Sequence, residues 1–230
     1  MKNYPKAFIF DLDGVITDTS EFHYLAWKKL ADEIGIKIDR EFNEKLKGIS
    51  RMESLDLILA LSPSNNNLSA DEKERLASKK NEHYQELIQS INATNILPGI
   101  EVLLKEIRRN NIKIALGSAS KNATEVLKQL GITEYFDFVV DASTVTKGKP
   151  DPETFTTAAD RLHIPYEACV GVEDAKAGVE AINKAEMFSV GVGEIKHLGD
   201  AKYVVQDTSE LVFEEIVKRY NDWNLHKGVR

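Results

Sequence analysis

The sequence predicts an α/β protein: a doubly wound, mostly parallel sheet interrupted after its first strand by an inserted helical domain. In residues 1–18 and 96–230, short apolar runs typical of buried parallel strands alternate with amphipathic helices. Residues 19–95 show helical periodicity and no strand-like run. Because alternating strands and helices favour a parallel sheet with right-handed crossovers, we expect a core domain at 1–18 and 96–230 and a helical insertion at 19–95.

The core strands are short apolar runs separated by helical patterns. KAFIFD at 6–11 is the first, and its continuous apolar character fits a strand buried on both faces. Asp151-Pro152 forms an N-cap and N1 pair that opens a helix, and a final helix is expected from about Thr208. The later strands are expected at IKIALG (112–117), FDFVV (136–140), ACVGV (168–172), MFSVGVG (187–193) and KYVVQ (202–206).

The helical insertion shows three amphipathic patterns. The first has one apolar face, a second follows it, and a third, long helix opens at the capping box Ser69 to Glu72 and runs to about Ile91. Since the insertion follows the first strand, it must enter and leave beside that strand's C-terminal end, where open parallel sheets hold their ligands. The apolar positions that define the first two helices are Trp27, Leu30, Ala31, Ile34, Leu55, Ile58 and Leu59.

Composition excludes several classes of protein. The chain has 230 residues, a formal net charge of −7 and one cysteine, Cys169, which excludes an internal disulfide and a cysteine-based zinc site. The acidic balance argues against nucleic acid as the main partner, although a small anionic substrate stays possible where Lys and Arg cluster. No stretch approaches the ~20 apolar residues of a membrane span, and the N-terminus is unlike a secretory signal, so we expect a soluble cytoplasmic protein.

Four polar clusters follow predicted strands, and each alone has an ordinary structural interpretation. Asp11-Leu-Asp13-Gly14 could be a turn, although a calcium loop is excluded because its later ligands are missing. Ser118-Ala-Ser120 could cap a helix, Lys149-Pro150 commonly precedes one, and Glu173-Asp174 would complement a helix dipole. Four strand ends that together carry carboxylates, a hydroxyl and an amine favour a catalytic site.

These clusters resemble the motifs of the haloacid dehalogenase superfamily. DLDGVITDT, a serine after the second strand, KGKPDPETF and GVEDAKAG follow in that family's order, with the insertion in the place of its small cap. The resemblance implies a haloacid dehalogenase-like core, a helical cap, Mg²⁺ and an aspartyl-phosphate. A carboxylate needs no deprotonation at neutral pH to attack phosphorus, so Asp11 suits the nucleophile.

The same resemblance assigns the remaining core residues. Asp13 would be the general acid and base, and Lys149 would neutralise charge on the transferring phosphoryl group. Ser118 and the Ala119 amide would bind its oxygens. Mg²⁺ prefers oxygen ligands and would separate carboxylates that otherwise repel. The implied metal ligands are Asp11, the backbone carbonyl of Asp13, Glu173 and Asp174.

The cap sequence LKGISRMESL and the core sequence GSASKNA resemble motifs of the sugar-phosphate mutases in that superfamily. This implies a phosphosugar substrate: interconversion of β-D-glucose 1-phosphate and β-D-glucose 6-phosphate through β-glucose 1,6-bisphosphate. Arg51 would hold the distal phosphate through its bidentate fork. His23 and Thr19 would act on Asp13. The other implied substrate-binding residues are Lys47, Gly48, Ser50, Ser54, Lys80, Asn81, Ser120, Lys121 and Asn122.

Three other functions compete with the mutase hypothesis. A sugar-phosphate phosphatase would share the core motifs and release free phosphate. A non-catalytic sugar-phosphate sensor is disfavoured because Asp11, Asp13 and Lys149 are all present. A true dehalogenase is disfavoured because a halide leaving group gives Asp13 no proton to transfer. We expect no nucleic-acid or membrane partner, and we expect a monomer.

Overall fold

The chain divides into two compact units. The computed structural model describes residues 4–46, 49–62 and 68–227. One unit, the core unit, comprises Met1–Asp18 with Asn92–Arg230, and the other, the cap unit, comprises Thr19–Ile91. The sequence placed residues 92–95 with the insertion, yet they lie in the core unit. A hydrogen bond ties this segment to the core unit, since Thr17 Oγ1 donates to the Asn95 carbonyl at 2.8 Å.

A six-stranded sheet forms the centre of the core unit. Its order is β3-β2-β1-β4-β5-β6, and every strand pairing is parallel, which confirms the predicted doubly wound α/β fold. From the centre of the sheet, the chain order proceeds outwards through β1, β2 and β3 on one side and through β4, β5 and β6 on the other. The topological switch point therefore lies between β1 and β4, where such sheets bind ligands. The strands are β1 (Ala7–Phe10), β2 (Lys113–Leu116), β3 (Phe138–Val139), β4 (Cys169–Glu173), β5 (Phe188–Val192) and β6 (Tyr203–Val205).

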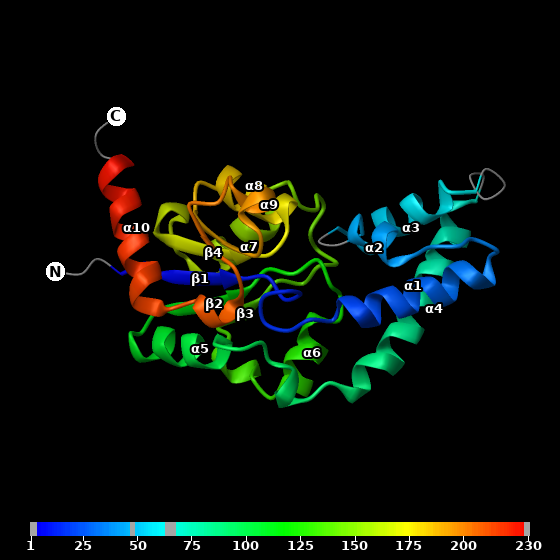
Figure 1. Ribbon diagram of the computed structural model, residues 1–230, viewed down its shortest axis with the longest axis horizontal. Helices are drawn as coiled ribbons and strands as arrows, with labels where there is room; N and C mark the ends of the chain where they lie inside the picture. The colour runs from blue at the N-terminus through cyan, green and yellow to red at the C-terminus, as the bar shows by residue number, and fades with distance from the viewer. Residues whose placement is uncertain (1–3, 47–48, 63–67, 228–230) are drawn as a thin grey trace. The chain divides into compact units, whose positions relative to one another are not determined.

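Helices cover both faces of the sheet (Figure 1). On one face, Ile9 of β1 packs in a buried apolar cluster with Phe155 of α7 and Ile182 of α8. On the other, Phe8 lies against Phe213 of α10, with ring centroids 6.2 Å apart. Both faces of β1 are therefore buried, as its continuous apolar run predicts. The core helices are α5 (Ile100–Arg109), α6 (Ala123–Leu130), α7 (Glu153–Leu162), α8 (Lys176–Lys184), α9 (Ile195–Leu198) and α10 (Phe213–Lys227).

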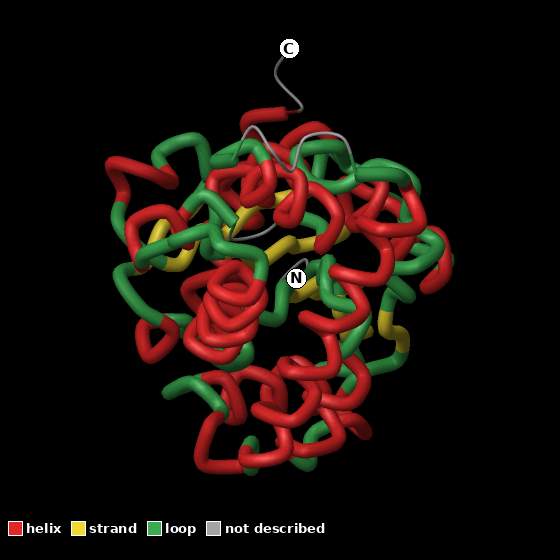
Figure 2. The backbone as a smooth tube through the Cα atoms, turned by 90° about the vertical axis from the view of Figure 1, so that its right-hand side faces the viewer, coloured by secondary structure: helices red, strands yellow, loops and turns green. Residues whose placement is uncertain are grey.

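The described part of the cap unit contains helices and no strand. Its apolar cluster includes Trp27 and Leu30 from the first helix, Leu55 and Ile58 from the third, and Ala77 from the fourth. This agrees with the predicted helical faces. Figure 2 distinguishes the helices from the strands of the core unit by colour. The cap helices are α1 (Ser20–Glu33), α2 (Arg40–Glu44), α3 (Arg51–Leu59) and α4 (Ala70–Leu87).

Three helix boundaries differ from the sequence prediction. The final helix, expected from about Thr208, begins at Phe213, because Thr208–Glu210 forms a separate 3₁₀ turn. Pro152 is the N-cap of α7 rather than its first helical residue, because the helix begins at Glu153, whose amide donates to Asp151 Oδ1 at 3.1 Å. The long cap helix ends at Leu87 instead of continuing to about Ile91, and a 3₁₀ turn follows. None of the helices in the described ranges is long and apolar enough to cross a bilayer. Further 3₁₀ turns occur at Ala93–Asn95, Thr133–Tyr135, Tyr166–Ala168 and Thr208–Glu210.

Candidate active site

Adjacent strand ends bring two predicted site residues together. Asp11 directly follows β1, and its amide donates to the Val172 carbonyl of β4 at 2.9 Å. Glu173 is the last residue of β4. The parallel register pairs Phe10 with Val172 and with Leu116 of β2, so the ends of the three strands lie level. The polar residues after these strands are thereby gathered at one edge of the sheet.

Lys149 bridges the two acidic residues of this edge. Its Nζ donates to Asp11 Oδ1 at 2.6 Å and to Glu173 Oε1 at 2.5 Å. All three side chains are buried. The second oxygen of Glu173 accepts from the Ala175 amide at 2.7 Å, and the ring centroid of Phe155 lies 5.2 Å from Lys149 Nζ. We name Asp11, Lys149 and Glu173 the buried triad.

Burial and charge perturb the ionisation of this cluster. Burial raises the pKa of Asp11 to about 7, with Lys149 opposing the rise and the carboxylates of Glu173 and Asp13 adding to it. Burial, followed by repulsion from Glu173 and Asp11, also holds the pKa of Asp174 well above its usual value. Although burial opposes it, the two carboxylates raise the pKa of Lys149, so the amine stays protonated. Negative charge at this edge exceeds what one ammonium group neutralises.

The donor set fits a hard divalent cation. Ligand oxygens of Asp11, Glu173 and Asp174 all lie within 4.8 Å of one another. Three carboxylates with one ammonium leave the negative charge that a dication would compensate, and oxygen donors suit Mg²⁺ or Ca²⁺ rather than a soft metal. The Asp13 side chain is outside this group, so its predicted contribution through the backbone carbonyl stays a prediction.

Two glycines that were not singled out as site residues make room for the carboxylates. A Cβ atom at Gly178 would overlap the Glu173 carboxylate, and one at Gly14 would overlap that of Asp174. Gly14 also has a φ of +73°, in the left-handed region that disfavours other residues. Both glycines lie inside the recognised motifs DLDGVITDT and GVEDAKAG, so motif membership was the available signal.

The segment after β2 presents a chain of hydroxyl contacts. The Ser120 amide donates to Ser118 Oγ at 3.1 Å, and the Asn122 amide donates to Ser120 Oγ at 3.2 Å. Ser118 and Asn122 are buried, whereas Lys121 is exposed. These contacts fix the turn that leads into α6. Ala119 lies in this turn, where its amide was predicted to bind a phosphoryl oxygen.

In the cap unit, His23 and Lys80 form one polar contact surrounded by aromatic rings. Lys80 Nζ lies 2.8 Å from His23 Nδ1, and 4.7 and 4.8 Å from the ring centroids of Trp27 and Tyr84. Burial, and then the charges of Lys80 and Arg51, hold the pKa of His23 well below its usual value. A neutral imidazole that accepts at Nδ1 carries its proton on Nε2.

Other predicted cap residues have definite partners within this unit. Tyr84 donates from its hydroxyl to Thr19 Oγ1 at 3.1 Å, and Arg51 donates to Asn81 Oδ1 at 2.8 Å. Ser50 is the N-cap of α3 in a capping box with Glu53.

Three further cap positions were predicted to bind substrate, and the structure describes one of them. Ser54 is buried, and its hydroxyl donates to the Ser50 carbonyl at 3.0 Å within the first turn of α3. The predicted substrate contacts Lys47 and Gly48 lie outside the described residues.

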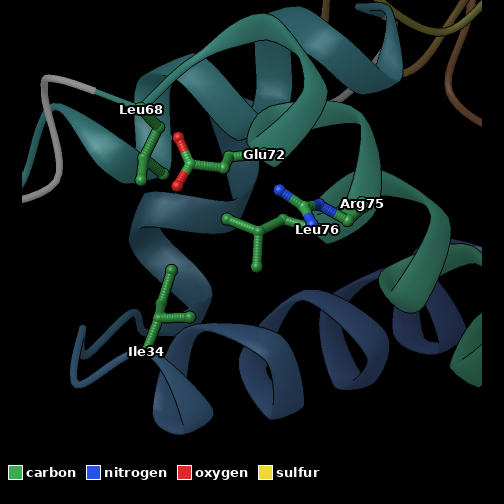
Figure 3. A pocket seen from close by; sticks show the side chains of 5 residues that line it. All are labelled: Ile34, Leu68, Glu72, Arg75 and Leu76. Atoms are coloured by element: carbon green, nitrogen blue, oxygen red, sulfur yellow. The ribbon is translucent and has the colours of Figure 1, made fainter.

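A groove of about 350 Å³ in the cap unit is lined by other residues (Figure 3). None of its lining residues was predicted to bind substrate. The carboxylate of Glu72 already accepts from the Ser69 amide at 2.8 Å and from its hydroxyl at 2.7 Å, as the capping box of α4. The groove therefore adds nothing to the candidate active site. It is lined by Ile34, Leu68, Glu72, Arg75 and Leu76.

Comparisons with known proteins agree with this geometry. Residues 5–186 match the model of the haloacid dehalogenase-like hydrolase family. A β-phosphoglucomutase of Bacillus subtilis is 45% identical over 97% of this chain and 99% of its own. A crystal structure of β-phosphoglucomutase from Clostridium difficile has 53% identity and a TM-score of 0.94, covering 96% of this chain and 99% of that one.

A phosphatase is also among the relatives. The phosphorylated carbohydrates phosphatase of Thermotoga maritima is 29% identical over 87% of this chain and 90% of its own. The family model matches most of the length of this chain. The matched residues include the core motifs, most of the parallel sheet and the polar cluster at its edge. The chain belongs to the haloacid dehalogenase-like hydrolase family.

Proposed function

We propose that this chain interconverts β-D-glucose 1-phosphate and β-D-glucose 6-phosphate through β-glucose 1,6-bisphosphate. The observation that carries the proposal is the similarity to two β-phosphoglucomutases over nearly the whole of both chains. The buried triad supports it, because it places a carboxylate and an ammonium group 2.6 Å apart at the ligand-binding edge of the sheet.

Asp11 is the proposed nucleophile. One of its oxygens bonds to phosphorus while the bond from phosphorus to the sugar oxygen breaks, which gives an aspartyl-phosphate. Asp13 gives its proton to the departing oxygen and, in the return step, accepts the proton of the attacking hydroxyl. Phospho-Asp11 transfers its phosphoryl group to the free 6-hydroxyl of β-glucose 1-phosphate, so that the bond from Asp11 to phosphorus breaks and the bisphosphate forms. The bisphosphate then turns over, and its other phosphoryl group passes to Asp11, which releases β-glucose 6-phosphate. The contact of Lys149 with Asp11 suits it to stabilise the charge of the transferring group.

Mg²⁺ is the cation that we assign to the acidic group. Asp11, Glu173, Asp174 and the backbone carbonyl of Asp13 would hold it, and it would supply charge neutralisation between the carboxylates and the phosphoryl oxygens. Ser118 and the Ala119 amide are proposed to bind the phosphoryl oxygens, and Ser120, Lys121 and Asn122 to provide further donors near α6.

The cap residues are proposed to recognise the sugar and the phosphate that is not reacting. Arg51 is assigned to that phosphate because its guanidinium can form two parallel hydrogen bonds to it. His23, held neutral, can donate from Nε2 to a carboxylate or a sugar hydroxyl. Thr19 is assigned to positioning Asp13. The sugar contacts are proposed to come from Lys47, Gly48, Ser50, Ser54, Lys80 and Asn81.

A coupled assay tests the proposal. The purified protein receives β-glucose 1-phosphate, Mg²⁺ and a trace of β-glucose 1,6-bisphosphate, and glucose 6-phosphate and free phosphate are measured together. We expect isomerisation to exceed phosphate release, and Asp11→Asn to abolish both. An α-glucose 1-phosphate control tests the preference for the β anomer. Absence of product from the wild type, or full turnover by Asp11→Asn, would refute the proposal.

A sugar-phosphate phosphatase is the alternative function. It is favoured by the similarity to the Thermotoga maritima phosphatase over most of both chains. The same assay separates the two functions, because a phosphatase releases one phosphate for each substrate consumed and leaves no glucose 6-phosphate. A panel of phosphosugars without bisphosphate measures how far hydrolysis accompanies isomerisation.

The compartment and the assembly state belong to the proposal too. Phosphosugars are charged and do not cross bilayers unaided, so we place the enzyme in the cytoplasm, where sugars are phosphorylated. We also propose that it acts as a monomer. Cell fractionation and light scattering of the purified protein measure these two properties.

A further inference from the structure

We propose that Glu153, at the start of α7, is a positioning residue that holds the loop of Lys149 in its productive place. This inference rests on the proposed function in one respect, namely that Lys149 serves phosphoryl transfer. The physical question is how a loop lysine is held. Lys149 lies between β3 and α7 in a segment without helix or strand, yet its Nζ meets two carboxylates at 2.5 and 2.6 Å.

The carboxylate of Glu153 binds that loop at three donors. Its Oε1 accepts from the Thr146 amide at 2.7 Å, and its Oε2 accepts from Thr146 Oγ1 at 2.7 Å and from the Lys147 amide at 2.8 Å. These hydrogen bonds, led by the one from the Thr146 amide, hold the pKa of Glu153 below its usual value. Both oxygens are therefore occupied by the two residues that lie just before Gly148 and Lys149.

The other side of the loop is bound as well. The Asp151 amide donates to the Gly148 carbonyl at 3.0 Å, and Asp151 Oδ1 accepts from the Glu153 amide at 3.1 Å. Lys184 of α8 donates to the Pro150 carbonyl at 3.1 Å. The residues on either side of Lys149 thus have fixed backbone partners, and Glu153 supplies the partners on the N-terminal side.

Helix α7 is a rigid support for this contact. Phe155, two residues after Glu153, is fully buried against the sheet, and its ring centroid lies 5.2 Å from Lys149 Nζ. One helix therefore locates Lys149 twice: Phe155 lies beside the ammonium group, and Glu153 binds the backbone that leads to it. Catalytic groups that must be held within fractions of an ångström depend on such supporting contacts.

An ordinary helix-start carboxylate would behave differently. A negative side chain in the first turn stabilises a helix wherever it occurs. Glu101 of α5 is the matched case, since it is also acidic, in the first turn of a core helix, and paired with Lys105 at 2.6 Å. Glu101 contacts its own helix, whereas Glu153 contacts the loop that carries Lys149. Comparing Glu153→Gln with Glu101→Gln separates positioning from helix stabilisation.

The test is a double-mutant cycle on phosphoryl transfer. Wild type, Glu153→Gln, Lys149→Ala and the double variant are assayed for isomerisation and for hydrolysis of p-nitrophenyl phosphate, with Glu101→Gln as the control. Hydrolysis of p-nitrophenyl phosphate requires phosphoryl transfer to Asp11 but no recognition of a sugar. A wild type without isomerase activity would therefore refute the proposed function, while the hydrolysis assay would still test this inference. Thermal unfolding of each variant records stability separately.

We expect Glu153→Gln to lower kcat by roughly 10- to 100-fold with little change in KM, because a displacement of about 1 Å costs about that much. Glu101→Gln should keep the wild-type kcat. In the Lys149→Ala background, Glu153→Gln should have almost no further effect, because the group that it positions is gone. Equal losses in both backgrounds, or a kcat for Glu153→Gln equal to that of Glu101→Gln, would overturn the inference.

A second variant covers the case in which Glu153→Gln does not fold. Thr146→Val has nearly the same shape and removes only the hydroxyl donor to Glu153 Oε2. Thr146 is exposed, so the substitution opens no cavity. We expect a smaller loss in kcat, on the order of 3-fold, which again vanishes when Lys149 is Ala. An unchanged kcat, or a loss that persists in the Lys149→Ala background, counts against the inference.

Discussion

Gly178 of α8 lies directly against the carboxylate of Glu173, so that a Cβ atom at position 178 would overlap Glu173 Oε1. The same oxygen accepts the 2.5 Å hydrogen bond from Lys149. Glu173 is fully buried, and the side chain has little room in which to move aside. The missing side chain at Gly178 therefore determines where an acidic group at the end of β4 can lie.

The first prediction concerns Gly178→Ala. Alanine is favoured over glycine inside a helix by about 1 kcal/mol, so helix propensity alone would stabilise this variant. We expect it instead to lose activity on the order of 100-fold and to gain no stability, because the Glu173 carboxylate is displaced. Steady-state kinetics over a range of Mg²⁺ concentrations and thermal unfolding measure both effects.

The control for this substitution is Gly131→Ala at the end of α6. Gly131 has a φ of +71°, and a Cβ there meets no neighbour within 4 Å. The left-handed backbone should cost about 1–2 kcal/mol of stability and leave kcat unchanged. Wild-type activity and an unchanged Mg²⁺ requirement in Gly178→Ala would contradict the prediction.

A second prediction concerns the buried charge of Lys149. Lys149→Met keeps the length of the side chain but leaves Asp11 and Glu173 buried without their cation. Breaking a buried ion pair from one side costs about 3–5 kcal/mol, so we expect a loss of that size in the free energy of unfolding. Denaturant unfolding without divalent metal measures it. Lys113→Met, which removes an exposed pair with Asp137, should cost less than about 1 kcal/mol. Equal losses in the two variants would show the prediction wrong.

The sequence was sufficient to predict the strand-end residues of the site. KAFIFD and ACVGV are continuous apolar runs, and parallel strands of that kind place their carboxyl ends at one edge. Asp11 and Glu173 could therefore be expected near each other although 162 positions separate them, and their shared contact with Lys149 confirms that neighbourhood. The family motifs added Lys149, whose loop has no periodicity to indicate where it lies.

Local hydrogen bonding was harder to predict, because one sequence pattern can serve two purposes. Ser50 to Glu53 is a capping box, S-x-x-E, yet the resemblance assigned Ser50 to the sugar. Ser54 likewise bonds to its own helix. Glu153 lies inside the recognised motif KGKPDPETF, yet the resemblance assigned it no role, and its reach back to Thr146 depends on how the loop turns. Such contacts follow from three-dimensional paths that periodicity does not encode.

A third prediction tests the hydroxyl of Tyr84. Tyr84 is fully buried and donates to Thr19 Oγ1 at 3.1 Å. Tyr84→Phe keeps the ring and leaves Thr19 without this donor, so we expect a loss of about 0.5–1.5 kcal/mol in the free energy of unfolding. Tyr166→Phe is the matched control, because its hydroxyl donates to the exposed Asp160 at 2.9 Å and water can replace that bond. The prediction does not hold when both variants unfold at the same denaturant concentration.

A fourth prediction concerns acid stability and Asp137. Burial raises the pKa of its carboxyl, but hydrogen bonds from Lys113 and the Ile114 amide and the charge of Arg108 outweigh that effect and leave the pKa below the usual 3.8. A carboxyl group with a lowered folded-state pKa contributes stability above its unfolded pKa, and that contribution is lost as the pH falls through the folded value.

Asp137→Asn should therefore lower the free energy of unfolding at pH 7. This difference from the wild type should shrink as the pH falls below about 4. The Asp137 side chain is only 15% exposed, but the side chains of its partners Arg108 and Lys113 are 43% and 54% exposed, so we expect an effect of about 1 kcal/mol. Urea unfolding of both proteins at pH 7 and at pH 3 measures the difference. A deficit of Asp137→Asn that stays constant with pH would contradict the assigned cause.

The last prediction concerns the metal. Asp11, Glu173 and Asp174 crowd three carboxylates within 4.8 Å, and Lys149 neutralises only part of their charge. A bound dication should therefore stabilise the folded chain, since a ligand that binds only the native state raises the free energy of unfolding by RT ln(1 + [L]/Kd). We expect chelator-treated protein to be folded but inactive, and Mg²⁺ to raise its melting temperature and restore turnover. Ca²⁺ should raise the melting temperature without restoring activity, because it accepts looser coordination than Mg²⁺.

Asp174→Asn should raise the Mg²⁺ concentration for half-maximal activity by about 10-fold or more, whereas Asp160→Asn should leave it unchanged. Full activity in the presence of excess chelator, or equal Mg²⁺ requirements in the two variants, would exclude this acidic group as the metal site.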